Sequence, residues 1–130
     1  MKEKTRQLLD DLLDTLGMGE STNSEERHCT LLFDEKLVVN LEVREEESRL
    51  FFSVLIGSLP MPLSAELMKQ LLVLNLDLAR YNRMSLGLEQ HSGQLVLCHD
   101  VNTWHASLSN VEEALAQLLN QAEQCQNLLH

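Results

Sequence analysis

Residues 71–97 constrain the fold more than any other part of this chain. The first half of the stretch has a helical pattern but is apolar on nearly all sides, at Leu71, Leu72, Val73, Leu74, Leu76 and Leu78. A surface helix in a small monomer normally shows one apolar stripe and one polar face. A helix that is apolar on several sides must be covered on several sides, and 130 residues provide few layers to do so. The pattern therefore indicates a partner subunit.

The second half of the stretch predicts a β-hairpin. Residues 84–89 alternate between apolar and polar side chains, and the chain turns back through residues 91–93 into the apolar run 95–97. We expect the helix and the first hairpin strand to form the interface of a homodimer. The candidate interface residues are Leu71, Leu74, Leu78, Met84, Leu86 and Leu88.

Two polar residues, Asn75 and Asp77, interrupt the otherwise apolar helix. One interpretation is that both side chains face solvent. The other is that they fix the register of a subunit interface, as a buried polar residue does in some coiled coils. The pattern alone leaves these two interpretations equally open.

The N-terminal third of the chain predicts one helix and three strands. Leucines recur at helical spacing over residues 2–16, Gly17 and Gly19 offer stop positions, and the polar residues 20–27 predict a loop. Period-two alternation with short connections then predicts an antiparallel meander. Its three strands are expected at residues 30–33, 37–44 and 50–56.

Two longer helices complete the pattern. One is expected to begin near Ser64, a good N-cap residue, and to end at about residue 80. The other is expected over about 110–128, where Ser109 and Glu112 fit a capping box. It carries a narrow apolar seam suited to lying on a sheet, formed by Val111, Leu115, Leu118, Ala122, Cys125 and Leu129.

The order of these elements is α-β-β-β-α-β-β-α. That order predicts an α+β fold in which helices pack on a twisted antiparallel sheet. A length of 130 residues favours one domain over residues 1–130. No apolar run approaches the roughly 20 residues of a membrane span, and the N-terminal helix carries acids that a secretory signal would lack. We therefore expect a cytoplasmic protein without membrane insertion.

The charge distribution argues against a nucleic-acid partner. The formal net charge is −10, and residues 84–130 hold five acids and no lysine or arginine. Contacts from lysine and arginine to phosphates supply most nucleic-acid affinity. The same reasoning disfavours an anionic membrane surface. An acidic protein of this kind attracts basic or neutral partners instead.

Cysteine and histidine residues are the best candidates for chemistry. Cys29 follows His28, and Cys98 precedes His99, so that two pairs offer four soft ligands. Both pairs fall in or beside predicted strands, where neighbouring side chains point to opposite faces. A Cys-His hydrolase built on Cys98 lacks any family signature. Free thiols, including Cys125, are therefore the preferred interpretation, with no metal, no cofactor and no catalysis.

Three segments resemble a known family. The run LLVLNL at residues 71–76 and the run SLGLEQHSGQLVL at 85–97 are similar to the second helix and following hairpin of class I chaperones of bacterial type III secretion, the CesT-like family. The run EEALAQLLNQAEQC at 112–125 resembles the last helix of that family. The sequence differs from the family pattern at two places. Residues 81–83 stand where the family often has a small glycine-rich connection, and Glu89 stands where Asp is common.

The resemblance implies a virulence-associated cytoplasmic homodimer in a bacterium. It implies that the dimer holds the N-terminal segment of a secreted effector in an extended form. It also implies delivery of that segment to the secretion apparatus without ATP hydrolysis. The residues themselves agree, because they show more apolar surface than one small core requires and no catalytic constellation.

The effector is expected to bind across the first helix and the first strand. The first strand of a meander has one sequential neighbour, so it is expected at a sheet edge, where an incoming strand can pair. The candidate effector-binding residues are Leu9, Leu12, Leu16, Leu31 and Phe33, each of which is as readily a core residue. The alternatives are a small dimeric α+β regulatory or ligand-binding domain, which would show a dominant enclosed pocket, and a thiol-dependent enzyme.

Overall fold

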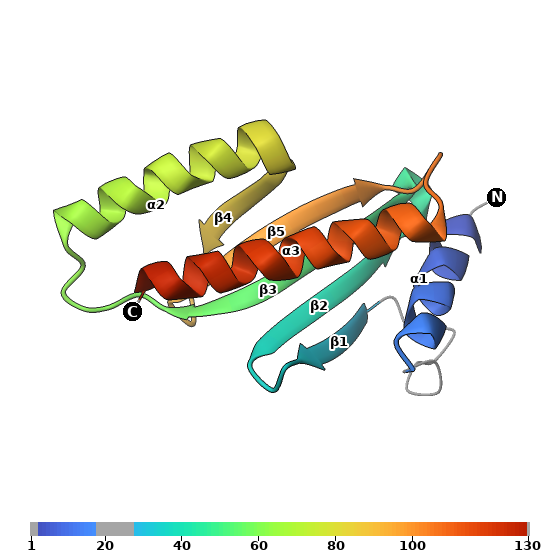
Figure 1. The fold of residues 1–130 in the computed structure, drawn as a ribbon, viewed down its shortest axis with the longest axis horizontal. Coiled ribbons are helices and arrows are strands. Elements are labelled where there is room, and N and C mark those ends of the chain that lie inside the picture. The colour runs from blue at the N-terminus through green and yellow to red at the C-terminus, as the bar shows by residue number, and fades with distance from the viewer. Residues whose placement is uncertain (1–2, 18–27, 130) are drawn as a thin grey trace.

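The structure is a computed structural model that describes residues 3–17 and 28–129. It contains α1 (Glu3–Thr15), β1 (His28–Phe33), β2 (Leu37–Arg44), a short 3-10 turn η2 (Glu45–Glu47), β3 (Arg49–Ser58), α2 (Ala65–Asp77), a π-helical segment η3 (Leu78–Asn82), β4 (Met84–Leu88), β5 (Gln94–Asn102) and α3 (Leu108–Leu129). The predicted order and α+β class are confirmed (Figure 1). The loop expected at 20–27 lies outside the described residues. None of the described helices has the length and apolar character needed to cross a bilayer.

The strands form one antiparallel sheet in the order β1-β2-β3-β5-β4. The predicted meander supplies the first three strands, β5 pairs with β3, and β4 forms the second edge. Successive side chains of a strand point to opposite faces. The row through Leu41, Phe52 and His99 therefore lies on one face, and the row through Asn40, Ser53 and Cys98 lies on the other.

Helices α1 and α3 pack on the first of these faces. Figure 1 shows α3 running along the sheet and α1 lying at one end of it. Phe52 is fully buried at the centre of this core, together with Leu12 and Leu13 of α1. The seam predicted for the last helix is confirmed at its first five residues, whereas Leu129 is only partly buried; the buried residues are Val111, Leu115, Leu118, Ala122 and Cys125.

Helix α2 packs against β4 and η3 at the far edge of the sheet (Figure 1). Ser64 is its N-cap, as predicted, and accepts a hydrogen bond from the Leu67 N–H at 3.1 Å. The helical stretch does not remain α-helical to residue 80, because the α-helix ends at Asp77 and η3 continues it as a π-helix. Arg83, with a left-handed φ of 57°, ends the segment.

Two local predictions were wrong. The last helix begins at Leu108, and its cap is formed by Ser107 and Asn110 rather than by Ser109 and Glu112. The Asn110 N–H donates to Ser107 Oγ at 3.2 Å, and the Ser107 N–H donates to Asn110 Oδ1 at 2.9 Å. The fifth strand also continues well past the apolar run 95–97 on which its prediction rests, because pairing with β3 extends to Asn102 opposite Arg49.

Candidate partner-binding surfaces

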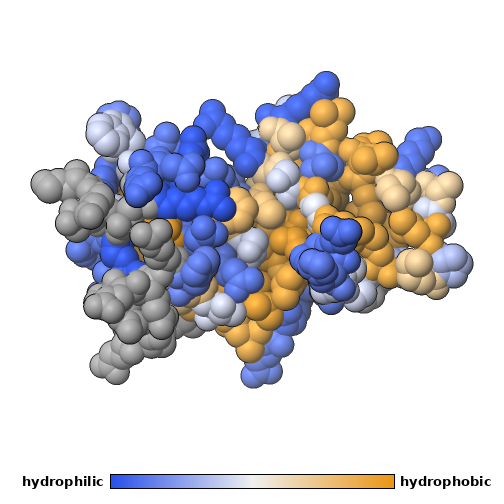
Figure 2. Space-filling view, turned by 180° about the vertical axis from the view of Figure 1, so that it is seen from behind, coloured by the Kyte–Doolittle hydropathy of each residue, from blue (hydrophilic) through white to orange (hydrophobic). Residues whose placement is uncertain are grey.

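The outward side of α2 is the first apolar surface of the molecule. Met68, Leu72, Val73 and Leu76 are exposed there, and Leu72 keeps 63 % of its surface in contact with solvent. Figure 2 shows, from behind, that apolar side chains gather on the half of the molecule that carries α2. A contiguous exposed apolar area of this kind marks a protein–protein contact site in soluble proteins. The surface therefore fits a partner.

The structure divides the predicted dimer residues into two groups. Leu71, Leu78 and Met84 are buried inside the protomer, where they join α2 and η3 to the core. Leu74 and Leu86 are partly buried, and Leu88 is 57 % exposed. Their part in a dimer remains a prediction. The sequence pattern showed that the helix is apolar all round, but it did not show which side faces β4.

Asn75 ties α2 to the edge of the sheet. Its Oδ1 atom accepts a hydrogen bond of 2.8 Å from the backbone N–H of Leu86 in β4. Asn75 does not simply face solvent, since it is half-buried and its bonding partner lies in the same chain, and its part in a subunit interface stays a prediction. Asp77, by contrast, is exposed. An edge strand with an unpaired N–H is open to unwanted strand pairing, and the Asn75 side chain closes this position.

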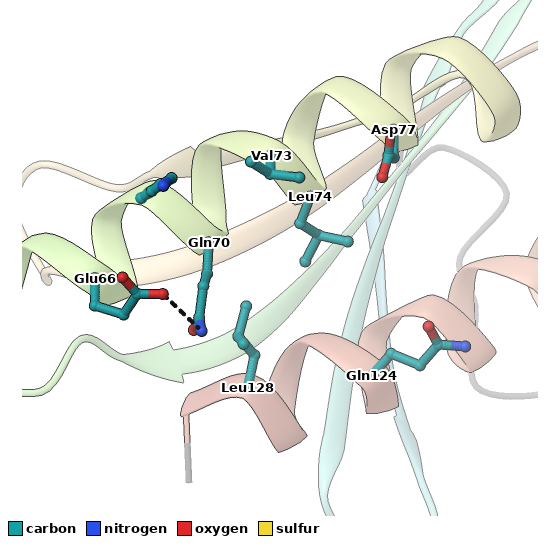
Figure 3. A pocket seen from close by; sticks show the side chains of 8 residues that line it. Glu66, Gln70, Val73, Leu74, Asp77, Gln124 and Leu128 are labelled. Atoms are coloured by element: carbon teal, nitrogen blue, oxygen red, sulfur yellow. Dashed lines mark hydrogen bonds between the residues drawn. The ribbon is translucent and has the colours of Figure 1, made fainter.

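A groove of about 380 Å³ separates α2 from α3. Figure 3 shows Leu74 and Gln70 of α2 above it and Leu128 of α3 pointing into it from below. Acidic side chains, Glu66 and Asp77, lie toward its two ends along α2. The groove is open to solvent and not the enclosed pocket expected of a small-molecule binding domain.

The second predicted surface lies around α1 and β1. The expectation that β1 is an edge strand is confirmed by its place in the sheet. Leu9, Leu12 and Leu31 are buried, whereas Leu16 and Phe33 are partly exposed. Nothing in the structure tests their contact with an effector. Sequence reasoning missed Leu32, which is 56 % exposed on the opposite face of β1, beside Val38 of β2.

Two of the thiols, those of Cys98 and Cys125, show no chemical activation. None of the three cysteines forms a disulfide, and burial raises the pKa of the Cys98 thiol and raises that of the Cys125 thiol to about 11. A thiolate is the reactive form, so a raised pKa makes both thiols poor nucleophiles at neutral pH. In the described part of the chain, no three His, Cys, Asp or Glu side chains cluster closely enough to hold a metal ion.

The contacts of His99 indicate a structural role for this side chain. It lies on the core face, opposite to its neighbour Cys98, with its ring edge-on to Phe52 at 6.4 Å between centroids. Its Nδ1 atom lies 3.2 Å from the carbonyl oxygen of Arg83, where η3 ends. Burial lowers the pKa of His99, although this carbonyl contact opposes the shift. A neutral imidazole therefore helps to position the turn between α2 and β4.

Comparison with protein families decides the identity of this fold. The model of the Tir chaperone protein (CesT) family matches residues 7–126. The chain belongs to the CesT family. The sequence-based resemblance to class I type III secretion chaperones is thereby confirmed.

Individual proteins of known function or structure are similar to this chain over nearly its whole length. The transcriptional anti-antiactivator ExsC of Pseudomonas aeruginosa is 27 % identical over 129 residues, which cover 99 % of this chain and 88 % of ExsC. A chain of the ExsC–ExsE complex superimposes with a TM-score of 0.80 at 26 % identity, covering 99 % of this chain and 96 % of that chain. A chain of the HopA1–SchA chaperone–effector complex also reaches a TM-score of 0.80, at 19 % identity and with 97 % of this chain and 95 % of that chain covered, which shows that the two chains share a fold.

Proposed function

We propose that this CesT-family chain is a homodimeric chaperone of the bacterial cytoplasm. It binds the N-terminal segment of a secreted effector in an extended form and keeps that segment competent for secretion, without ATP hydrolysis or other catalysis. The observation that carries the proposal is the exposed apolar surface of α2 and β1 on a chain of this family. Delivery of the bound segment to the secretion apparatus completes the proposed role.

The homodimer is supported by the outward side of α2. Obligate interfaces are large and apolar. Leu72, Val73 and Leu76 are each more than half exposed, which is costly for a helix that faces solvent alone. A second copy would cover these side chains without any change in the protomer core.

The effector surface is supported by the sheet edge at β1. An extended segment can add to an edge strand through backbone hydrogen bonds while its side chains enter nearby apolar sites. Phe33 and Leu16 are the predicted residues with side chains at the surface, and Leu32 adds an exposed apolar group on the other face. Leu9, Leu12 and Leu31 would support this surface from the core beneath it.

The proposal is tested by capture and titration. The tagged chain is expressed in its native host, and the proteins captured with it are identified by mass spectrometry. A peptide with the sequence of the N-terminal segment of a captured protein is then titrated against the purified chain. Phe33→Glu is expected to weaken peptide binding more than tenfold, because it places a charge at an apolar contact. Gln117→Glu, on the exposed side of α3, makes the same charge change away from β1 and serves as the control.

Circular dichroism and light scattering must show that the Phe33→Glu variant keeps its fold and mass. Full affinity in a folded variant would show that the effector uses another surface. If the chain captures no secreted protein and instead binds a host enzyme or a small ligand, that result would contradict the chaperone function itself.

A regulatory partner is the second candidate. The relative ExsC, at 27 % identity, is a transcriptional anti-antiactivator. A chaperone that also binds a regulatory protein would link secretion to gene expression. The same capture experiment separates the two roles. A regulatory protein that competes with the effector peptide for binding would support a combined role, and capture of effectors alone would argue against it.

A further inference from the structure

The turn between α2 and β4 is anchored at both ends and exposed in the middle. Leu78, which begins η3, is 1 % exposed, and Met84, which begins β4, is 2 % exposed. Residues 79–81 and 83 between them are exposed, and Tyr81 keeps 75 % of its surface in contact with solvent. Figure 1 shows this stretch where the chain leaves the end of α2 and turns into β4. We refer to residues 79–83 as the basic turn.

Three backbone features fix the shape of the basic turn. Its helical part is a π-helix, a rare form that is frequent at functional sites. Arg83 closes it with a left-handed φ of 57°, and the Arg83 N–H donates to the carbonyl oxygen of Leu78. The Nδ1 atom of His99 in β5 lies 3.2 Å from the Arg83 carbonyl oxygen. The exposed side chains are therefore presented on a preorganised backbone, which lowers the cost of binding a partner.

The basic turn is a positively charged site on an acidic protein. Arg80 and Arg83 are exposed, and none of the ion pairs in the described part of the chain involves either. Arg83 is also the last lysine or arginine of the sequence. Asp77 is the only acid within residues 70–88, so the two arginines give this stretch a net positive charge, against −10 for the whole chain. Both guanidinium groups are thus available to carboxylates of another molecule.

The side chains of the basic turn are of the types that dominate binding in protein interfaces. Tyrosine and arginine are enriched among the residues whose removal costs the most affinity. An arginine side chain can hold a carboxylate through two parallel hydrogen bonds, and a tyrosine ring gives an apolar side chain a surface to pack on. Residues 81–83 are also a place where this sequence differs from the family pattern. The combination therefore belongs to this sequence and does not follow from the fold.

We propose that the basic turn binds a short acidic segment of a second protein partner. Carboxylates of that segment bond Arg80 and Arg83, and an apolar side chain of the segment packs on Tyr81. The site lies next to β4 at one edge of the sheet, whereas the proposed effector site lies at β1, the opposite edge. The chain can therefore hold an effector segment and an acidic partner at the same time.

The charge of the whole chain favours a short acidic protein segment over a nucleic acid. A nucleic acid gains its affinity from many phosphate contacts, and two arginines supply few of them. The net charge of −10 also repels a long polyanion. A segment with few carboxylates beside an apolar residue meets the local positive charge of the basic turn and little of this general repulsion.

Selection from a random peptide library tests this site. Phage that display short random peptides are first depleted on the Arg80→Glu variant and are then selected on the wild-type chain. The enriched peptides are expected to carry aspartate or glutamate beside an aromatic or aliphatic residue. Synthetic copies with a fluorescent label are then titrated by fluorescence polarisation. Enrichment of no peptide, or of peptides without net negative charge, would overturn the proposal.

Three variants separate charge from packing. Arg80→Glu is expected to weaken binding of an enriched peptide roughly tenfold or more, because a guanidinium–carboxylate contact becomes a repulsion. Tyr81→Ala keeps every charge and is expected to weaken binding by a similar factor, because the apolar side chain of the peptide loses its contact. Lys36→Glu, in the turn between β1 and β2, makes the same charge change at the other edge of the sheet and is the matched control.

Further measurements distinguish the basic turn from the two surfaces described above. Arg80→Glu should leave the mass of the chain in light scattering unchanged, and its affinity for an effector peptide within about twofold of wild type, because distant sites act independently. A loss of mass would show that Arg80 contacts a second copy of the chain. A loss of effector affinity would make the basic turn part of the effector surface. Either result would overturn the proposal.

A single-stranded oligonucleotide is the last probe. It is expected to bind more weakly than the acidic peptides. Tighter binding of the oligonucleotide, lost in the Arg80→Glu variant, would identify a nucleic-acid site and contradict the assignment of an acidic protein segment.

Discussion

At the scale of single residues, one side chain joins helix α2 to the edge strand β4. Asn75 is the polar residue that an otherwise apolar helix uses to bond the edge strand β4, through the N–H of Leu86. The bond fixes how α2 sits against the sheet, and so it fixes the direction in which Leu72 and Leu76 point. An amide oxygen is needed here because a partly buried N–H without an acceptor is costly.

Asn75→Leu is expected to lower the free energy of unfolding by about 1–3 kcal/mol, because it leaves the Leu86 N–H without its acceptor. Asn75→Asp keeps an oxygen at the same position and should lose less. Urea unfolding at one protomer concentration measures both. Equal stability of wild type and Asn75→Leu would show that water replaces the amide without cost.

At the scale of elements, the two faces of the helical segment formed by α2 and η3 have different roles. Leu71 and Leu78 face inward and are 8 % and 1 % exposed, whereas Leu72 and Leu76 face outward. The inner face holds the protomer together, and the outer face is the proposed dimer contact. Helix propensity does not distinguish them, because leucine occupies both sides.

Leu76→Glu is expected to give a folded protein with the mass of a monomer at micromolar concentration, since the charge lies at the interface and remains hydrated in the protomer. Leu71→Glu is expected to destabilise the protomer itself by several kcal/mol, because it buries an unpaired charge. Light scattering and thermal unfolding compare the two variants. A dimeric Leu76→Glu would place the contact elsewhere.

At the scale of the whole molecule, net charge shapes how a partner approaches. The chain carries a formal charge of −10, and its last 47 residues, 84–130, contain no lysine or arginine. An acidic protein raises the rate at which a basic segment associates, and salt weakens this steering. The affinity for the segment would then come from the apolar contacts at the surface, and the high association rate would come from the charge.

The association rate of a basic effector segment is expected to fall by about tenfold or more between about 0.05 and 0.5 M salt, whereas the dissociation rate changes little. Stopped-flow fluorescence measures both rates. The control is the same peptide with its lysines and arginines replaced by glutamine, which should show a nearly flat dependence. An equally flat response from the basic peptide would exclude electrostatic steering.

Local patterns in the amino-acid sequence were enough to predict the order of the elements, the α+β class, the edge position of β1, the seam of α3 and the family. These properties depend on local periodicity, turn residues and short connections, which act over a few residues. The cap of α3 was mistaken because Ser107 and Ser109 both offer hydroxyl caps at nearly the same place. The end of β5 was mistaken because its last residues are held by pairing with distant β3.

Which apolar residues belong to the core and which to the surface became clear from the packing of the elements against one another. Leu9, Leu12 and Leu31 were candidates for effector contact and lie buried, and the outward side of α2 emerged only once the other side, with Leu71, was packed into the core. The physical reason is that leucine has the same local pattern on either side of a helix. Burial depends on what packs against that side, and here α2 packs on β4 and η3, to which the bond from the Leu86 N–H to Asn75, eleven positions away in the chain, adds one contact.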